Sequence, residues 1–355
     1  MNANTSASQS EPRTQPNASR GSELSESERE LRAQIAEELA VPVRESVAWL
    51  AGEIAAMHGD AVLGVLFYGS CLRKETDEGV LDFWVIVDDY RSAYKKFLPG
   101  LVNKIAPPNV FFTEREYTAS PTAGEGKPAT TTLRTKYGVI NRKAFAKGNS
   151  LRSPHPYIWA RFAQPARLVL CRDDEARAYF AETVSDAVVT LVGSLTCQLP
   201  QREGLFRFSL QAFWEEAFRR TYDSERRPEA ADAITNLYHE DEERYDAVGA
   251  CAMKILAEKG HFASASEHPQ AFAVEIPNHL AQKRRWTRMR PYARAIGLVR
   301  LLKTAFTFGD WVPYVLWKLE RHTGRKIELT ERQRKHPLIF AWPVIIPLLR
   351  KRNLR

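Results

Sequence analysis

Short strand-like and longer helix-like patterns of apolar residues follow one another along the chain. Strands favour short runs of Val, Leu, Ile and aromatic residues, and helices favour apolar residues three or four positions apart. By these patterns, strands are predicted at 63–67, 80–87, 109–113, in the first part of 133–145, and at 166–172. Helices are predicted from Ser25 onward, over 90–105, at the end of 133–145, and through a long stretch from Asp173 to about Phe262.

This order of elements predicts an α/β fold, in which a small mixed sheet with helices is followed by a helical second domain. Residues 1–24 are rich in Ser, Asn and Pro and predict a disordered leader. We therefore expect four parts: the leader 1–24, an α/β domain 25–172, a helical domain 173–272 and a basic C-terminal segment 273–355.

Charge is distributed unevenly along the 355 residues. The whole chain carries +8, whereas 282–355 alone holds 19 Lys and Arg against 4 Asp and Glu, a net +15. The rest of the chain is therefore acidic, and the basic end predicts an anionic partner, either a membrane surface or nucleic acid. The four cysteines form no C-x-x-C pair, so neither a zinc site nor a disulfide framework is indicated, and a reducing, cytoplasmic setting is expected.

The C-terminal segment favours the membrane surface over nucleic acid. No apolar run approaches the roughly 18 residues that a spanning helix needs. The 12 mostly apolar residues of 338–349 are bracketed by Arg and Lys, a pattern typical of insertion at an anionic membrane interface. Trp311, Tyr314 and Trp317 are predicted to add an interfacial belt. The alternative is a buried terminal segment.

The candidate chemistry lies between the first two predicted strands. Gly69-Ser70 ends the first strand, where backbone N–H groups and a hydroxyl can approach a phosphate. Asp82 is a lone carboxylate in an apolar run, which is costly unless a cation pairs with it. Such a carboxylate can bind Mg²⁺ for nucleotidyl transfer. The pattern resembles the nucleotidyltransferase signature, although an ordinary hairpin with an edge aspartate would share it.

The second carboxylate of that signature is replaced here. It usually stands two residues after the first, where this chain has Trp84. Asp88 and Asp89 lie too far along the strand and are expected to cap the next helix. The missing metal ligand is left open among three acidic residues, Glu114, Glu116 and Glu225.

Several motifs in order resemble the mitochondrial-type phosphatidate cytidylyltransferases, the translocator assembly and maintenance family. The resemblance spans about 63–320 and rests on FYGSCLR, VLDFWVIVDD, NVFF, TKYGVI, PYIWARFAQPARLV and TYDSERRPE, with a similar closing helix near the C-terminus. It implies a nucleotidyltransferase domain, a helical, winged-helix-like domain and a membrane-contacting C-terminal segment.

The implied activity is Mg²⁺-dependent transfer of a cytidylyl group from CTP to phosphatidic acid, giving CDP-diacylglycerol and pyrophosphate for phospholipid and cardiolipin precursor synthesis. The protein would then be a cytoplasmic, peripheral membrane enzyme, and no nucleic acid partner is expected. The implied catalytic residues are Ser70, Asp82 and Lys136, with Asp82 as metal ligand. The implied nucleotide- and substrate-binding residues are Tyr68, Gly69, Tyr137, Gly138, Arg161, Tyr222, Glu225 and Arg227.

Each role has a structural alternative. Lys136 would hold the triphosphate or be a solvated strand-end lysine, and Arg161 would hold a phosphate or form an ion pair with an acidic residue. Two other functions also fit the sequence: nucleotidyl transfer to a soluble acceptor, and nucleic-acid binding through the helical domain and the basic tail.

Overall fold

The computed structural model describes residues 24–94, 100, 103, 107–119, 130–225, 231–268 and 271–307. The chain begins with two helices, α1 (Glu26–Ala40) and α2 (Glu45–Ala56). Ser25 caps α1 through a capping box with Glu28, in which each side chain bonds the other's backbone N–H. The helices predicted from Ser25 onward are confirmed.

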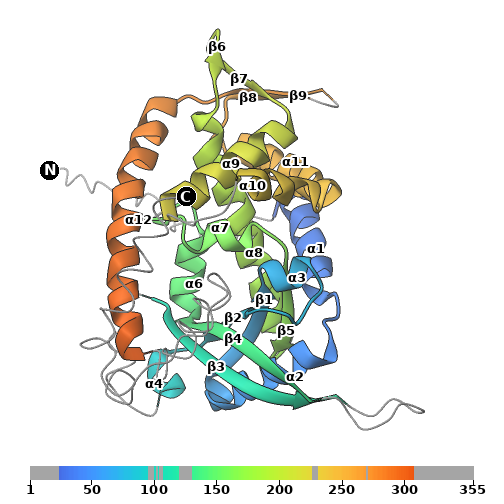
Figure 1. Cartoon of the computed structure of the whole chain (residues 1–355). Helices are drawn as coiled ribbons and strands as arrows, with labels where there is room; N and C mark the ends of the chain where they lie inside the picture. Colours follow the sequence, from blue (N-terminus) through green and yellow to red (C-terminus); the bar gives the residue numbers. More distant parts are fainter. Residues whose placement is uncertain are drawn as a thin grey trace, which may run out of the picture.

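A five-stranded mixed sheet forms the lower part of the molecule in Figure 1. Its strands run in the order β3-β4-β2-β1-β5; β2 and β4 are parallel, and the other neighbours are antiparallel. The α/β class and all five predicted strands are confirmed. The strands are β1 (Val62–Tyr68), β2 (Leu81–Val87), β3 (Asn109–Thr118), β4 (Thr130–Asn141) and β5 (Ala166–Cys171).

Short helices connect these strands. The 3₁₀ turn η1 (Gly59–Ala61) precedes β1, and α3 (Ser70–Arg73) follows it. Asp89 caps α4 (Tyr90–Ala93) as predicted, whereas Asp88 instead pairs with Arg172. Most of the helix predicted over 90–105 lies outside the described residues. The remaining helices of this region are α6 (Arg142–Asn149) and α7 (Trp159–Phe162).

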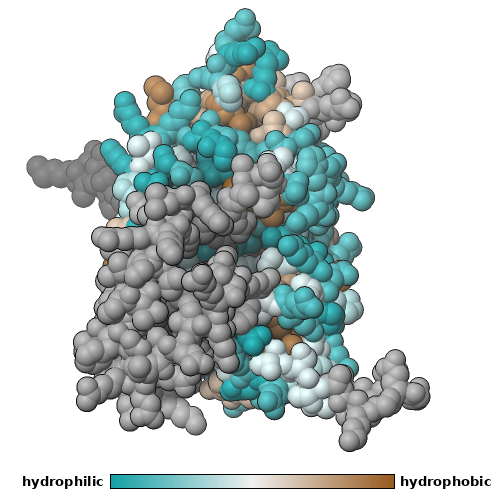
Figure 2. All heavy atoms as spheres, in the orientation of Figure 1, coloured by the Kyte–Doolittle hydropathy of each residue, from teal (hydrophilic) through white to brown (hydrophobic). Residues whose placement is uncertain are grey.

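The second half of the chain is mainly helical. Its helices are α8 (Asp174–Leu195), η2 (Thr196–Gln198), α9 (Leu210–Glu225), α10 (Ala231–His239), α11 (Glu242–Glu258) and α12 (His279–Thr307). In Figure 1, α12 runs along one side of the molecule, from the second sheet toward β3. Figure 2 shows hydrophilic residues over most of the described surface on this side.

A second, antiparallel sheet of order β6-β7-β9-β8 interrupts the stretch predicted to be helical throughout. Its first turn has two successive residues with positive φ, Glu203 (+51°) and Gly204 (+81°), the geometry of a tight hairpin. Glutamate is an unusual residue for such a turn, which explains why the sequence pattern did not reveal it. The strands are β6 (Gln201–Arg202), β7 (Leu205–Phe208), β8 (Ser264–His268) and β9 (Ala271–Glu275).

One hydrophobic core extends across the predicted boundary at residue 172. It contains Leu31 and Ile35 of α1, Trp84 of β2, Val188 of α8 and Trp214 of α9. Glu38 fixes the same junction: it accepts a hydrogen bond from the Ala166 N–H and pairs with Arg244 of α11. The opposite face of the sheet has its own core under α2. Sheet and helices therefore share buried surface.

One helical segment of the described chain, Asp174–Gln198, has the length and composition to cross a membrane. In this fold, 83% of its most apolar stretch is buried inside the protein. It packs against α1, α7 and α11, which accounts for its apolar character.

Candidate active site

Asp82 and the Gly69-Ser70 turn meet at one end of the sheet. Tyr68, the last residue of β1, lies opposite Asp82 in the antiparallel register, so the turn that follows reaches the carboxylate. Gly69 has φ +93°, and a Cβ at this position would lie 3.2 Å from Asp82 Oδ2. Ser70 is exposed at the start of α3. The close approach therefore requires a glycine at position 69.

Lys136 supplies the cation that the sequence predicts beside Asp82. The parallel pairing of β2 with β4 sets the two residues directly opposite each other, and Lys136 Nζ lies 3.0 Å from Asp82 Oδ1. The side chains remain 38% and 21% exposed, respectively. Oδ1 is buried and accepts no hydrogen bond of good geometry from the described residues, so the contact is an ion pair. The pair is thus held by the sheet but open to a ligand.

Tyr68 and Trp84 form the wall behind this pair. The Trp84 indole N–H donates a 3.2 Å hydrogen bond to the Tyr68 hydroxyl. Burial raises the pKa of Tyr68, and the nearby negative charge of Asp82 raises it further. Trp84 packs against Phe145 and Phe162 in the core. The position that usually carries a second carboxylate is therefore apolar.

Arg161 and Glu225 form a second charged pair. Arg161 donates two hydrogen bonds to the Glu225 carboxylate, of 2.7 and 2.8 Å, and a third to the Tyr157 carbonyl. Only 10% of the Arg161 side chain and 12% of the Glu225 side chain are exposed. Burial lowers the pKa of Arg161, but the Glu225 carboxylate outweighs burial and raises this pKa well above its usual value. The sequence left two roles open for Arg161, holding a phosphate or forming an ion pair with an acidic residue, and the structure shows the ion pair.

A further cluster, which the sequence did not reveal, lies beside Arg161. The guanidinium carbons of Arg161 and Arg300 lie 3.9 and 4.0 Å from the centre of the Tyr157 ring. Arg300 also contacts His155 Nε2 at 3.1 Å and donates to the Pro107 carbonyl. Burial and the Arg300 charge lower the pKa of His155 to about 3. Arg300 lies 145 residues beyond His155, so no local motif connects them.

The remaining predicted residues that the structure describes are not gathered around Asp82. Tyr137 lies in the core on the opposite face of the sheet, stacked on Phe111 at 5.2 Å. Gly138 adjoins Trp84, 3.6 Å from where its Cβ would be, and Tyr222 is buried in α9. Arg227 lies outside the described residues. Of the three open metal-ligand candidates, Glu114 pairs with Arg134, Glu225 pairs with Arg161, and Glu116 lies on the same strand as Glu114, β3.

Asp82 is the metal ligand that the sequence predicts. Within the described ranges, no group of three or more His, Cys, Asp and Glu side chains is arranged to hold a metal. Mg²⁺, however, is commonly bound by one or two carboxylates together with substrate phosphates and water. Oδ2 of Asp82 lies beside the Gly69 turn, which can approach a phosphate, while Oδ1 faces Lys136, so Oδ2 suits that mode of binding.

Neither a protein-family model nor a curated protein matches this chain.

Proposed function

We propose that the protein is a nucleotidyltransferase-like enzyme that transfers a cytidylyl group from CTP to phosphatidic acid, forming CDP-diacylglycerol and pyrophosphate. One observation carries the proposal: the Asp82 carboxylate is held between the Gly69 turn and the Lys136 ammonium. The mixed sheet is compatible with a nucleotidyltransferase-like fold. The lipid acceptor and the cytidine base come from the sequence resemblance.

The reaction needs positioning and charge neutralisation more than acid–base catalysis. A phosphate oxygen of phosphatidate attacks the α-phosphorus of CTP. A new P–O–P bond forms, and the bond to the β-phosphate breaks as pyrophosphate leaves with the electron pair. Lys136 offsets the negative charge that gathers on the phosphate oxygens, and Gly69 lets the chain approach them closely.

Asp82 would hold Mg²⁺ together with the nucleotide phosphates, and the bound ion would polarise a phosphoryl oxygen. Lys136 also keeps Asp82 in place when no substrate is bound, through the 3.0 Å pair. Arg161 is assigned a positioning role, because Glu225 and the Tyr157 carbonyl already hold its guanidinium.

The test measures pyrophosphate release from CTP with phosphatidate vesicles and Mg²⁺. We expect Asp82→Asn to lower the rate by about 10²–10³, the range seen when one electrostatic group of a transition state is removed. The matched control is Glu182→Gln, which removes a carboxylate from an exposed ion pair with Arg32. A wild-type rate in Asp82→Asn would contradict the proposal.

Two further experiments identify the nucleotide base and the acceptor of the transferred group. A panel of the four nucleotides should give lipid product with CTP alone, and chelation of Mg²⁺ should stop the reaction. If pyrophosphate is released only when a soluble acceptor is added, and not with vesicles, the acceptor is a soluble compound and phosphatidate is not the substrate. Salt-dependent retention on DNA without transferase activity would favour the nucleic-acid-binding alternative.

We also propose that the protein works at the cytoplasmic face of a membrane, with its basic C-terminal segment against anionic lipids. Residues 338–349, with Trp311, Tyr314 and Trp317, lie outside the described part of the chain, so support comes from their sequence pattern. Flotation with anionic but not neutral vesicles is the expected result, and failure to float with either would refute this part.

A further inference from the structure

Two adjoining hollows lie between α12 and residues 151–154, lined by residues other than the Asp82 group. The first is a partly enclosed hollow of about 210 Å³, lined mainly by the apolar side chains of Leu151, Leu256, Trp286 and Met289. The second is an open groove of about 710 Å³ lined by Arg152, Arg284, Arg285 and Arg288. Arg285 and Met289 line both, so the two spaces are neighbours.

The groove is lined by several positively charged side chains. Within the described part of the chain, no acidic residue lines either space. Among the described residues, Arg152, Arg284 and Arg288 make no ion pair with an acidic side chain. Grouping several cations in one concave surface costs electrostatic free energy, which an anion would recover.

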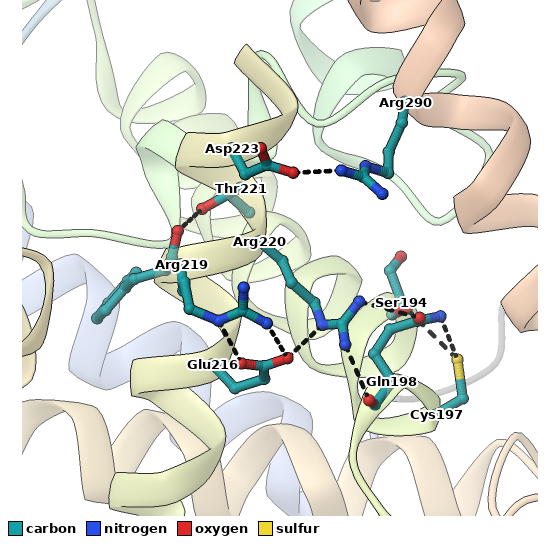
Figure 3. Close-up of polar contacts among 10 residues, drawn as sticks. Ser194, Cys197, Gln198, Glu216, Arg219, Arg220, Thr221, Asp223 and Arg290 are labelled. Atoms are coloured by element: carbon teal, nitrogen blue, oxygen red, sulfur yellow. Dashed lines mark hydrogen bonds and ion pairs between the residues drawn. The ribbon is translucent and has the colours of Figure 1, made fainter. Parts of the chain in front are cut away.

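Other arginines of α9 and α12 do have acidic partners. Figure 3 shows Arg219 and Arg220 held by Glu216, and Arg290 of α12 held by Asp223 of α9. The Arg290–Asp223 pair joins α12 to α9, whereas Glu216 holds Arg219 and Arg220 within α9. Arg284 and Arg288 therefore differ from Arg290 on the same helix, since neither has an acidic partner among the described residues.

The walls of the two spaces are built from ordered contacts. Arg285 donates hydrogen bonds to the carbonyls of Leu151 and Ser153, the latter at 2.9 Å, which joins α12 to the loop. Partial burial lowers the pKa of Arg285. Since burial disfavours the charged form, an anion nearby would stabilise this guanidinium.

Ser194 supplies an independent sign of a ligand. It lines the apolar hollow from α8 and is only 8% exposed. Its hydroxyl has no hydrogen-bond partner among the described residues. A buried hydroxyl without a partner costs roughly 1–3 kcal/mol, so a ligand oxygen at this position would be favourable.

We propose that the two spaces together bind one amphiphilic phosphate, a lipid whose phosphate head lies among Arg152, Arg284 and Arg288 and whose chain enters the hollow beside Trp286. Arginine guanidinium groups match phosphate geometry, and the hollow removes the chain from water. Ser194 donates its hydroxyl hydrogen to an ester carbonyl next to the chain. The site is distinct from the Asp82 pair, and the inference does not depend on nucleotidyl transfer.

The test is calorimetric titration of the full chain, without nucleotide or Mg²⁺, with dioctanoyl phosphatidate below its micelle concentration. Inorganic phosphate is titrated in parallel. We expect phosphatidate to bind at least about tenfold more tightly, because several methylenes enter the hollow. Equal affinity for the two ligands would show that phosphate alone is recognised and would overturn the lipid site.

A second binding experiment tests the arginines with the double variant Arg284→Gln, Arg288→Gln. Each arginine near an anionic headgroup is worth about fivefold in affinity, so we expect a loss of roughly twentyfold or more. The matched control removes the same charge from exposed, acid-paired arginines, Arg177→Gln with Arg219→Gln, and should bind as the wild type does. Unchanged affinity in the first variant would overturn the assignment of the arginines.

A second readout locates the chain of the lipid. A short-chain phosphatidate brominated on its acyl chain should quench the fluorescence of Trp286, and Trp286→Phe should remove that part of the quenching. Quenching that is identical in Trp286→Phe would place the chain elsewhere and refute the proposal. Asp82→Asn should leave lipid binding at the groove unchanged while slowing transfer by about 10²–10³, so failure of this inference and failure of the catalytic proposal are distinguishable.

Discussion

The variant Glu225→Gln tests whether the Arg161–Glu225 pair stabilises the fold. Both side chains are about nine-tenths buried, and two hydrogen bonds of 2.7 and 2.8 Å join them. Glutamine keeps the size of glutamate but removes its charge. It therefore leaves the Arg161 guanidinium buried without its balancing carboxylate.

The expected cost follows from the contacts that remain. Removing one partner of a buried ion pair typically costs about 3–5 kcal/mol. Arg161 keeps its hydrogen bond to the Tyr157 carbonyl and lies 3.9 Å from the centre of that ring, and the glutamine oxygen can still accept one hydrogen bond. We therefore expect a loss of about 2–3 kcal/mol in the free energy of unfolding.

Thermal unfolding measures this change directly. At the lower figure of about 2 °C per kcal/mol for large domains, Tm should fall by about 4–6 °C. The exposed pair of Arg32 and Glu182 provides the control, because Glu182→Gln should cost less than about 1 kcal/mol. The double variant Arg161→Met with Glu225→Met should lose less free energy of unfolding than the two single variants lose together. The difference should be at least about 1 kcal/mol. An unchanged Tm in Glu225→Gln would refute the reasoning.

Three further predictions concern the turn, a buried histidine and an aspartate of α8. Gly69→Ala should slow transfer at least about tenfold, since φ +93° is strained for alanine and its Cβ would crowd Asp82 Oδ2; full activity would contradict this. Burial and the charge of Arg300 lower the pKa of His155 from 6.5 to about 3, so the contribution of neutral His155 to stability is lost as pH falls below 6.5. The loss is up to about 1.4 kcal/mol per pH unit. The Tm of the wild type should therefore fall between pH 6.5 and 4.5, and His155→Gln should make this fall smaller. Desolvation by the neighbouring protein and the charge of Glu182 raise the pKa of Asp186 from 3.8 to about 6, so the contribution of Asp186 to stability is lost as pH rises through that range. Asp186→Asn should therefore steepen the fall in Tm between pH 6.5 and 4.5, and equal slopes in the His155 and Asp186 variants would contradict the opposite signs.

Local sequence patterns predicted the elements around the site well. Leu63–Phe67 was expected as a strand and lies within β1, and the amphipathic pattern that begins near Ser25 predicted the start of α1. The alternation of apolar residues also indicated that Asp82 needs a cation. These inferences succeeded because they depend on neighbours within a few residues along the chain.

Contacts between distant segments were beyond such patterns. Lys136 is recognised as the partner of Asp82 only when the parallel register of β2 and β4 is known. Glu225 lies 64 residues after Arg161, and their pairing depends on how α9 packs against α7. The β6–β7 hairpin was missed because its strands are two and four residues long, too short for a clear alternation.

The shared core has a consequence for how the chain is made. Leu31 and Ile35 of α1 belong to the same cluster as residues of α8 and α11, and α11 ends only at Glu258. At about 5–20 residues per second, the ribosome needs roughly 10–45 s after completing α1 to deliver α11. β5 and α8 are delivered earlier and can pack on α1, so for the rest of that interval only the side of α1 that contacts α11 lacks its final partner, and this core closes only after α11 has been made.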